Sequence, residues 1–190
     1  EIEKYCLKND DIIIDIGAHI GLFSLLVSRS CPNGKIFSFE PIKKNFSLLN
    51  NNLELNKLKN IFPFNLAVSK ESSKIKLFLD NDDSAHSLFG KNNKFETVES
   101  ISLDKIFDTN NIDSCKILKL DCEGAEYEII ESLPKEYFNR IENIIMEYHF
   151  ADSEPELVKK LIQKIKNMGF EISTKPHHNN MGFLIAHKNN

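Results

Sequence analysis

Short apolar runs rich in β-branched residues alternate with helical stretches over most of this chain. The first run is Ile12–Ile16, after which Phe23, Leu26 and Val27 recur at helical spacing. Strands that alternate with helices form βαβ units, which give a parallel sheet covered by helices on both faces. The strands expected are 12–16, 35–40, 61–68, 116–121, 143–149, 170–174 and 181–187, with less regular ones at 74–79 and 97–103. Helices are expected at 103–107, 125–133 and 154–168, and between the first three strands.

The end of the chain departs from this alternation. No helix separates the expected strands 170–174 and 181–187, so we predict an antiparallel hairpin at the edge of the sheet. The amphipathic helix before them shows a capping-box pattern at Ser153 and Glu156 and a helix-ending glycine at Gly169. We therefore predict one α/β domain over residues 1–190. It should be Rossmann-like, with a mostly parallel sheet and an antiparallel edge strand.

Charge and hydropathy limit the function classes. The formal net charge is -4, and the lysines are scattered among acids rather than clustered, which argues against nucleic acid as a partner. No apolar run is long enough to span a membrane, and residues 1–10 are too polar for a signal peptide, so we expect a cytoplasmic protein. The chain does not begin with Met, so an N-terminal segment is expected to be missing. Nothing in the pattern indicates an oligomeric state.

The four cysteines, Cys6, Cys31, Cys115 and Cys122, have no CxxC pairing and no histidine at metal-ligand spacing. We expect buried free thiols, as is usual in a reducing compartment. A catalytic thiol is the alternative.

A glycine-containing turn, DIGAHIG, closes the first strand over residues 15–21. Ligands of open α/β sheets bind at the carboxyl ends of the strands, and glycines let the backbone approach them closely. The G-x-x-x-G spacing is not the dinucleotide fingerprint, and Asp15 in front of it suits a cationic group better than a pyrophosphate. Taken alone, the same turn is equally well explained as a tight connection with no ligand.

A second acid, Glu40, ends the next strand and is followed by Pro41. A carboxylate in this place can accept hydrogen bonds from both hydroxyls of a ribose. One site that suits a cation and one that suits a ribose, on adjacent strands, match S-adenosylmethionine better than most small molecules.

The segment LKLDCEGAE over residues 118–126 places three acids after a buried strand. Asp121 and Glu123 could face the same side and act as a general base, hold an ammonium group or bind a metal. Glu126 is explained equally well as an acidic residue in the first turn of a helix, where it interacts favourably with the helix dipole.

Histidines supply further candidates. Period-two spacing puts Glu147 and His149 on one face of a strand, where His149 could take a proton from a hydroxyl or be a structural histidine. Together with Asp121 and Glu123 they could hold a divalent ion, which we do not expect because nothing in the sequence defines the geometry. His86 could line an acceptor pocket or be a surface residue, and His177 and His178 are expected in a turn.

The stretches IIIDIGAHIGLFSLLVS, FSFEP, NLAVS and ILKLDCEGAEYEIIES together resemble the FkbM family of S-adenosylmethionine-dependent methyltransferases over roughly residues 10–150. The resemblance implies a class I methyltransferase fold with seven strands, the last antiparallel. It implies that the first turn cradles the methionine part, Glu40 holds the ribose and the chain near Ala67 flanks the adenine. At position 19, where this family often has Asn, His is bulkier and can be charged. The cofactor positions so expected are Asp15, Gly17, Ala18, His19, Gly21, Ser24, Glu40, Pro41, Ala67 and Asp121.

The leading hypothesis is therefore methyl transfer to a hydroxyl of a sugar, glycan or natural-product acceptor, a class of acceptor that only the resemblance implies. The expected catalytic residues are Asp121, Glu123 and His149, with Asp121 and His149 as candidates for removing the proton. Two alternatives stay open. One is an NAD-dependent oxidoreductase, and the other is a catalytically silent module that binds the cofactor or a partner.

Overall fold

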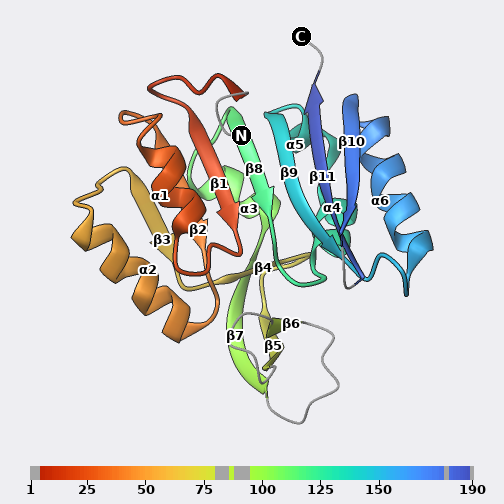
Figure 1. The fold of residues 1–190 in the computed structure, drawn as a ribbon, viewed down its shortest axis with the longest axis horizontal. Coiled ribbons are helices and arrows are strands. Elements are labelled where there is room, and N and C mark those ends of the chain that lie inside the picture. The colour runs from red at the N-terminus through yellow and green to blue at the C-terminus, as the bar shows by residue number, and fades with distance from the viewer. Residues whose placement is uncertain (1–4, 80–85, 88–94, 178–179, 189–190) are drawn as a thin grey trace.

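A seven-stranded sheet forms the centre of the computed structural model, which describes residues 5–79, 86–87, 95–177 and 180–188 (Figure 1). The strand order is β10-β11-β9-β8-β1-β2-β3. The bounds are Ile12–Ile16 (β1), Lys35–Phe39 (β2), Ile61–Phe64 (β3), Cys115–Leu120 (β8), Ile141–His149 (β9), Phe170–His177 (β10) and Met181–Lys188 (β11). The predicted fold class, a mostly parallel Rossmann-like sheet, is confirmed.

The strand order reverses between β1 and β8. From β1 the chain builds outward through β2 to β3, and later it returns to β8 on the other side of β1 and builds outward through β9. Both neighbours run parallel to β1, so the carboxyl ends of β1, β2 and β8 meet at one edge. This reversal is the point at which open α/β sheets bind ligands.

The predicted hairpin forms, but its antiparallel strand is not the edge strand. β11 pairs antiparallel with both β9 and β10, and β10 lies at the edge. The physical reason is the difference in apolar content between the two strands. Leu184 and Ala186 of β11 are fully buried, whereas most of β10 after Phe170 is exposed. His177, expected in a turn, is the exposed last residue of β10, and His178 lies outside the described residues.

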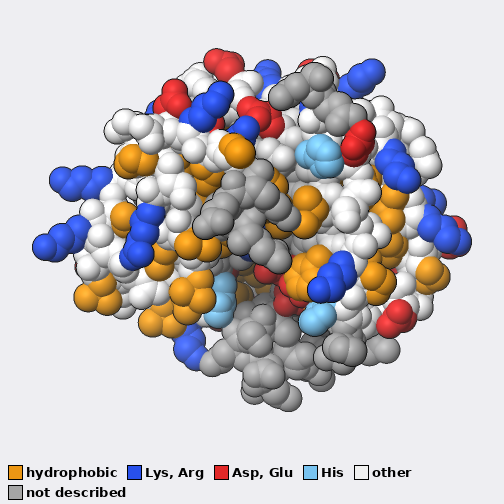
Figure 2. Space-filling view, turned by 45° about the horizontal axis from the view of Figure 1, so that its top comes forward, with side chains coloured by type: hydrophobic (Ala, Val, Ile, Leu, Met, Phe, Trp, Pro, Cys, Tyr) orange, Lys and Arg blue, Asp and Glu red, His pale blue; other side chains and the backbone are white. Residues whose placement is uncertain are grey.

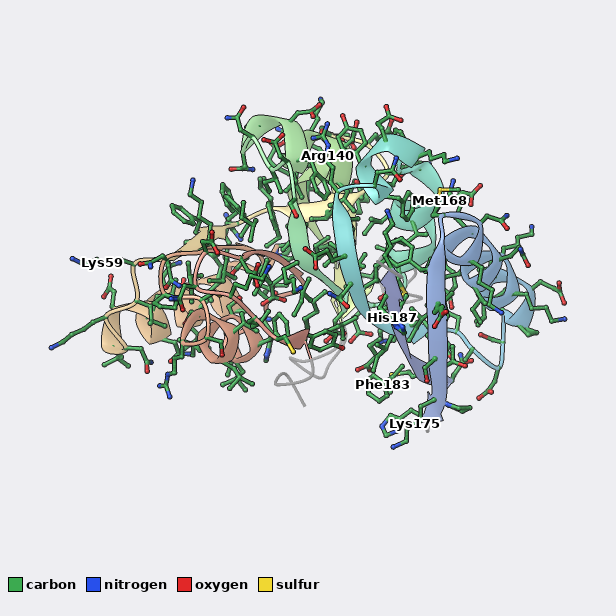
Figure 3. The ribbon with its side chains drawn as sticks, turned by 90° about the horizontal axis from the view of Figure 1, so that it is seen from above. Lys59, Arg140, Met168, Lys175, Phe183 and His187 are labelled. Carbon is green, nitrogen blue, oxygen red and sulfur yellow. The ribbon has the colours of Figure 1, made fainter. Side chains whose placement is uncertain are left out.

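Helices cover both faces of this sheet (Figure 3). The helices are Leu22–Ser28 (α1), Lys43–Leu55 (α2), Leu103–Thr109 (α3), Glu126–Ser132 (α4), Lys135–Phe138 (α5) and Pro155–Asn167 (α6). On one face α1 and α2 contribute Val27 and Leu49 to a core that includes Ile13. On the other face the core contains side chains from α3, α4, α5 and α6 together with Ile14 and Leu118 of the sheet. None of the helices in the described residues is long and apolar enough to cross a membrane.

A second sheet lies beyond the carboxyl ends of the first (Figure 1). Its order is β4-β7-β5-β6, with bounds Ala67–Ser69 (β4), Lys74–Leu79 (β5), His86–Ser87 (β6) and Phe95–Ser102 (β7). The single strand predicted over 61–68 is therefore wrong, because β3 ends at Phe64 and β4 belongs to the second sheet. Between them, the Asn65 amide donates to the carbonyl oxygens of Glu40 and Pro41, each at 2.9 Å.

The predicted capping box at Ser153 is wrong, since α6 begins at Pro155 and no side chain caps it. A residue before proline is disfavoured from helical geometry, whereas proline itself suits the first helical position. The rest of the prediction for this helix is confirmed, because Gly169 follows it with a φ of 87°. None of the four cysteines forms a disulfide, and Cys31 and Cys115 are buried as expected. Cys122 is partly buried, and the expectation of burial is wrong for Cys6, which is exposed.

Two leucines one turn apart on α6 allow a test of its packing. Leu161 is 4% exposed and Leu157 is 37% exposed. We expect Leu161→Ala to lower the free energy of unfolding by about 2–5 kcal/mol, because it leaves a cavity in the core. Leu157→Ala should cost about 1 kcal/mol or less. Urea unfolding of both variants measures the difference, and equal losses would contradict the packing described.

Candidate active site

A cavity of about 450 Å³ lies at the carboxyl edge of the main sheet and is closed on one side by the second sheet. This size is typical of small-molecule sites. Residues at the ends of β1, β2, β8 and β9 line it, and β4 and β5 contribute Ala67, Val68, Ile75 and Leu77. The sequence-predicted residues brought together in its wall are Gly17, His19, Glu40, Pro41, Ala67, Asp121, Glu123 and Glu147.

A larger hollow of about 1060 Å³ lies over α4 and α6. It is mostly apolar and includes none of the predicted catalytic or cofactor residues. Because the motifs converge at the strand ends instead, we take the smaller cavity as the candidate active site.

The turn after β1 is held against both neighbouring strands. The N–H groups of Gly17 and Ala18 donate to the carbonyl oxygen of Phe39 at 3.0 and 2.9 Å. Gly17 has a φ of +74°, and a Cβ atom there would lie 1.7 Å from the carbonyl oxygen of Asp121. A glycine is therefore required at this position by both conformation and space. His19 follows at a φ of 51° and lines the cavity.

Asp15 does not line the cavity. Its carboxylate is fully buried, accepts a hydrogen bond from Ser24 Oγ at 2.6 Å and lies 3.2 Å from Lys119 Nζ. The same ammonium donates to the carbonyl oxygen of Gly17 at 3.1 Å and lies 3.6 Å from Asp121. Burial alone would lower the pKa of Lys119, but the charges of the two aspartates outweigh it and raise that pKa.

Three other expected cofactor residues also lie outside the cavity lining. They are Ala18, Gly21 and Ser24. Gly21 packs against Leu49 of α2, and Ser24 shares a hydrogen bond of 2.7 Å with Ser38 behind the turn. These residues shape the turn from behind. Lys119, which sequence reasoning missed, was detectable as a lysine between two leucines, Leu118 and Leu120, of a strand predicted to be buried.

Glu40 lies 4% exposed at the end of β2 and points its carboxylate along the cavity wall. One of its oxygens accepts the N–H of His19 and the other accepts the N–H of Ile42, each at 2.9 Å. Burial raises the pKa of Glu40, while these hydrogen bonds and one to the side chain of Asn45 oppose that shift. Asn45 also lines the cavity and was not singled out from the sequence.

The turn after β8 carries the acidic residues. Glu123 adopts a φ of 53°, and Gly124 a φ of 107°, so the chain folds back sharply into α4. Glu126 is fully buried and accepts the N–H groups of Cys122 at 3.0 Å and Gly124 at 2.9 Å. It therefore braces the turn and is more than a helix-start acid.

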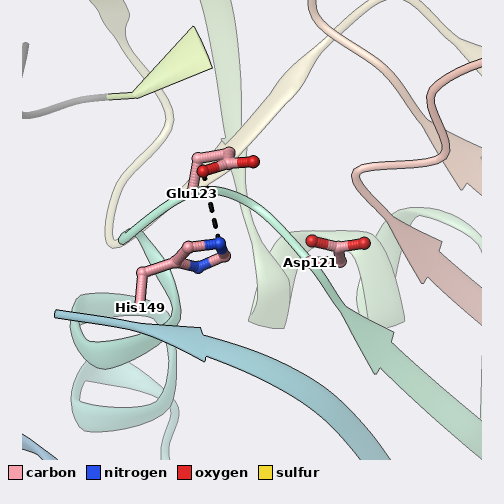
Figure 4. Close-up of side chains that lie close together, drawn as sticks. All are labelled: Asp121, Glu123 and His149. Atoms are coloured by element: carbon pink, nitrogen blue, oxygen red, sulfur yellow. Dashed lines mark ion pairs between the residues drawn. The ribbon is translucent and has the colours of Figure 1, made fainter. Parts of the chain in front are cut away.

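The same Glu126 contacts His149, which ends β9. His149 Nδ1 lies 3.1 Å from Glu126 Oε1. The other ring nitrogen lies 3.2 Å from Glu123 Oε2, and Figure 4 shows this second contact. Glu147 approaches that nitrogen to 3.8 Å. Burial disfavours a charged imidazole, but the hydrogen bond and charge of Glu126 dominate and raise the pKa of His149 to about 9. Burial raises the pKa of Glu123 to about 7.

Asp121, Glu123 and His149 thus form one cluster at the strand ends, in which Asp121 and Glu123 line the cavity and His149 does not. Their catalytic roles stay a prediction. Figure 2 shows acidic side chains gathered low in the centre of one face, between hydrophobic ones. The described cavity lining includes no lysine or arginine. The backbone of His86 lies in β6, but its side chain is outside the described residues, so its proposed place in an acceptor pocket stays a prediction.

Comparison with solved structures places the fold among the class I methyltransferases. A methyltransferase FkbM from Methylobacillus flagellatus superposes with a TM-score of 0.65 and 14% identity, over 95% of this chain and 44% of that one. A Streptococcus mutans protein solved in complex with SAH gives a TM-score of 0.59 and 12% identity, over 95% and 89%. The chain has the class I methyltransferase fold.

The chain belongs to the FkbM methyltransferase family, whose domain (Methyltransferase FkbM domain) matches residues 15–172. Among curated relatives, Methyltransferase 1 of Beauveria bassiana is 24% identical over 95% of this chain and 82% of its own length. Hexuronic acid methyltransferase AglP of Haloferax volcanii is 24% identical over 84% of this chain and 64% of its own. The family assignment made from the motifs is confirmed.

Two glycines with positive φ allow the energetic cost of left-handed backbone geometry to be measured apart from the cost of a steric clash. Gly169 has a φ of +87° and nothing near its missing Cβ, whereas Gly17 meets the Asp121 backbone. We expect Gly169→Ala to cost about 1–2 kcal/mol of unfolding free energy, the usual penalty of left-handed geometry. Gly17→Ala should cost clearly more, because backbone must also move. Urea unfolding compares them, and similar costs would refute the close approach of the β1 and β8 turns.

Proposed function

We propose that this chain transfers a methyl group from S-adenosylmethionine to a hydroxyl group of a sugar, glycan or related natural product. The observation that carries the proposal is one cavity with two chemically different ends. Glu40 lies at the end of β2 and Glu123 after β8, and the Gly17 turn and Asp121 meet between them. When bound, the cofactor supplies an electrophilic methyl group on a sulfonium.

The residues of the first end fit that cofactor. Only a glycine fits at position 17, because a Cβ there would meet the Asp121 backbone, and the turn that it allows lines the cavity. The Glu40 carboxylate accepts two backbone N–H groups and one hydrogen bond from Asn45, which leaves one of its four lone pairs for a ribose hydroxyl. Pro41 and Ala67 offer apolar surface beside it for an adenine ring. Asp15, Ala18, Gly21 and Ser24 would support the turn from behind rather than contact the cofactor.

The second end fits a hydroxyl acceptor. Asp121 is the candidate for taking the proton of the hydroxyl, and Glu123 would hold the hydroxyl by a hydrogen bond. His149, expected from the sequence to share the first role, does not line the cavity, and its pKa of about 9 keeps it protonated near neutral pH. Glu126 would orient His149 through its contact with Nδ1. The chain's task is then to align the acceptor oxygen with the methyl group and to receive one proton.

The charge of the wall supports an acceptor without phosphates. Asp121, Glu123 and Glu147 line the cavity, and the described lining offers no lysine or arginine against them. A nucleic-acid backbone would be repelled there. The name of the relative AglP, a hexuronic acid methyltransferase, supports a sugar as the acceptor class.

Calorimetric titration with S-adenosylhomocysteine and with NAD tests the donor. We expect binding of the former and none of the latter, and binding of NAD alone would overturn the proposal. Transfer is tested with methyl-labelled donor and a panel of sugars and uronic acids. Cofactor binding without transfer across that panel would favour the silent module instead.

Glu40→Gln tests the ribose contact. A charged hydrogen bond contributes about 1.5–3 kcal/mol, so we expect affinity for S-adenosylhomocysteine to fall about tenfold or more. Glu71→Gln, on an exposed residue outside the cavity, should leave the affinity unchanged. Calorimetry measures both, and an unchanged affinity in Glu40→Gln would remove this residue from the cofactor site.

Asp121→Asn tests the acceptor end. Loss of a group that receives the proton should lower kcat about tenfold or more. Asp113→Asn, at an exposed position just before β8, is the control. Turnover with labelled donor is measured for both, and unchanged turnover in Asp121→Asn would exclude that carboxylate from the chemistry.

A further inference from the structure

The three side chains at the acceptor end lie close enough to share one ion. Asp121 follows β8, Glu123 comes two residues later and His149 ends β9. One potential ligand atom from each lies within 4.8 Å of the others. Two carboxylate oxygens and one imidazole nitrogen form a donor set that suits a divalent cation.

The histidine adds an independent observation. His149 is 6% exposed, and its buried Nε2 atom makes no hydrogen bond. The nearest Glu123 oxygen is 3.2 Å away, yet it lies outside hydrogen-bond geometry. A buried nitrogen that faces the cluster and has no hydrogen-bond partner is costly, and a cation that displaced the proton from this nitrogen to solvent and was ligated by the lone pair would remove that cost (Figure 4).

The other nitrogen of the His149 ring, Nδ1, already makes the kind of contact that orients a metal-binding histidine. Histidines that bind metals usually donate their second N–H to a carboxylate, which sets the tautomer and the ring orientation. Here Nδ1 lies 3.1 Å from Glu126 Oε1. Glu126 is itself held by the N–H groups of Cys122 and Gly124, in the turn that presents Asp121 and Glu123. One buried carboxylate therefore orients the nitrogen ligand and braces the segment that carries the oxygen ligands.

Charge points the same way. Glu147 lies 3.8 Å from the same nitrogen and adds a third carboxylate to the wall. The positive charges beside this wall are His149 itself, when protonated, and Lys119, which is only 15% exposed and is shared with buried Asp15. The wall therefore carries more negative charge than its neighbourhood balances.

We propose that Asp121, Glu123 and His149 bind a divalent cation such as Mn²⁺ or Mg²⁺ at the acceptor end of the cavity. The assignment replaces our expectation from the sequence that no metal is bound. Cation binding stands on these contacts alone, and its role in catalysis rests on the proposed methyl transfer. In that reaction the cation would hold a hydroxyl oxygen of the acceptor. Because His149 would be a ligand, the proton of that hydroxyl would pass to Asp121, which would ligate the cation with one carboxylate oxygen and receive the proton on the other.

Titration of the whole chain with Mn²⁺, followed by the electron paramagnetic resonance signal of the free ion, tests the site without turnover. We expect one saturable site per chain. Glu123→Gln should weaken Mn²⁺ binding about tenfold or more, because it removes one charged ligand. Glu142→Gln, an exposed carboxylate near the opposite end of β9, is the matched control and should leave binding unchanged.

The wild-type protein provides a second readout that needs no variant. Spin-echo modulation from a directly bound imidazole nitrogen should appear in the Mn²⁺ complex. Absence of that modulation, absence of saturable binding, or equal binding by wild type and Glu123→Gln would each overturn the cation site. S-adenosylhomocysteine binding, measured separately, distinguishes this outcome from failure of the proposed function, because the cofactor end does not depend on the cation.

Discussion

The contacts of the Lys119 ammonium are the interaction on which the geometry at the reversal of strand order, between β1 and β8, depends. Its ammonium lies within 3.2 Å of buried Asp15 and donates to the carbonyl oxygen of Gly17. It also lies 3.6 Å from Asp121, so a single cation links the end of β1 to the end of β8. Without it, two carboxylates would face each other near a buried edge, where unpaired charge is costly. The approach of the Gly17 turn to the Asp121 backbone is possible because this charge is balanced.

From that edge the site divides into two halves with separate supports. Glu40 is held by the backbone N–H groups of Ile42, just after β2, and of His19, in the turn after β1. His149 is held by Glu126, which belongs to the turn after β8. The two halves meet where Gly17 contacts Asp121. Residues of both halves line the same cavity of about 450 Å³.

Much of the fold could be predicted because local patterns determine it. Apolar runs such as Ile12–Ile16 and amphipathic stretches such as α6 depend only on neighbouring residues. Glu40 and Asp121 were also found, because an acid at the end of a buried strand is a local signal. The break between β3 and β4 was missed because it rests on a long-range bond from Asn65 to the β2 end. The partner of Asp15 was missed for the same reason, since Lys119 is more than a hundred residues away.

The position of β11 has a consequence for synthesis of the chain. β11 lies inside the sheet, between β9 and β10, although β10 precedes it in sequence. During translation, β9 and β10 leave the ribosome before β11, the strand that pairs with both of them, so one edge of β9 is unpaired at that stage. The edge of β9, with its unpaired backbone N–H and C=O groups, can then pair with other nascent chains until residues up to Lys188 have emerged. Translational pausing within the last strands would prolong that interval.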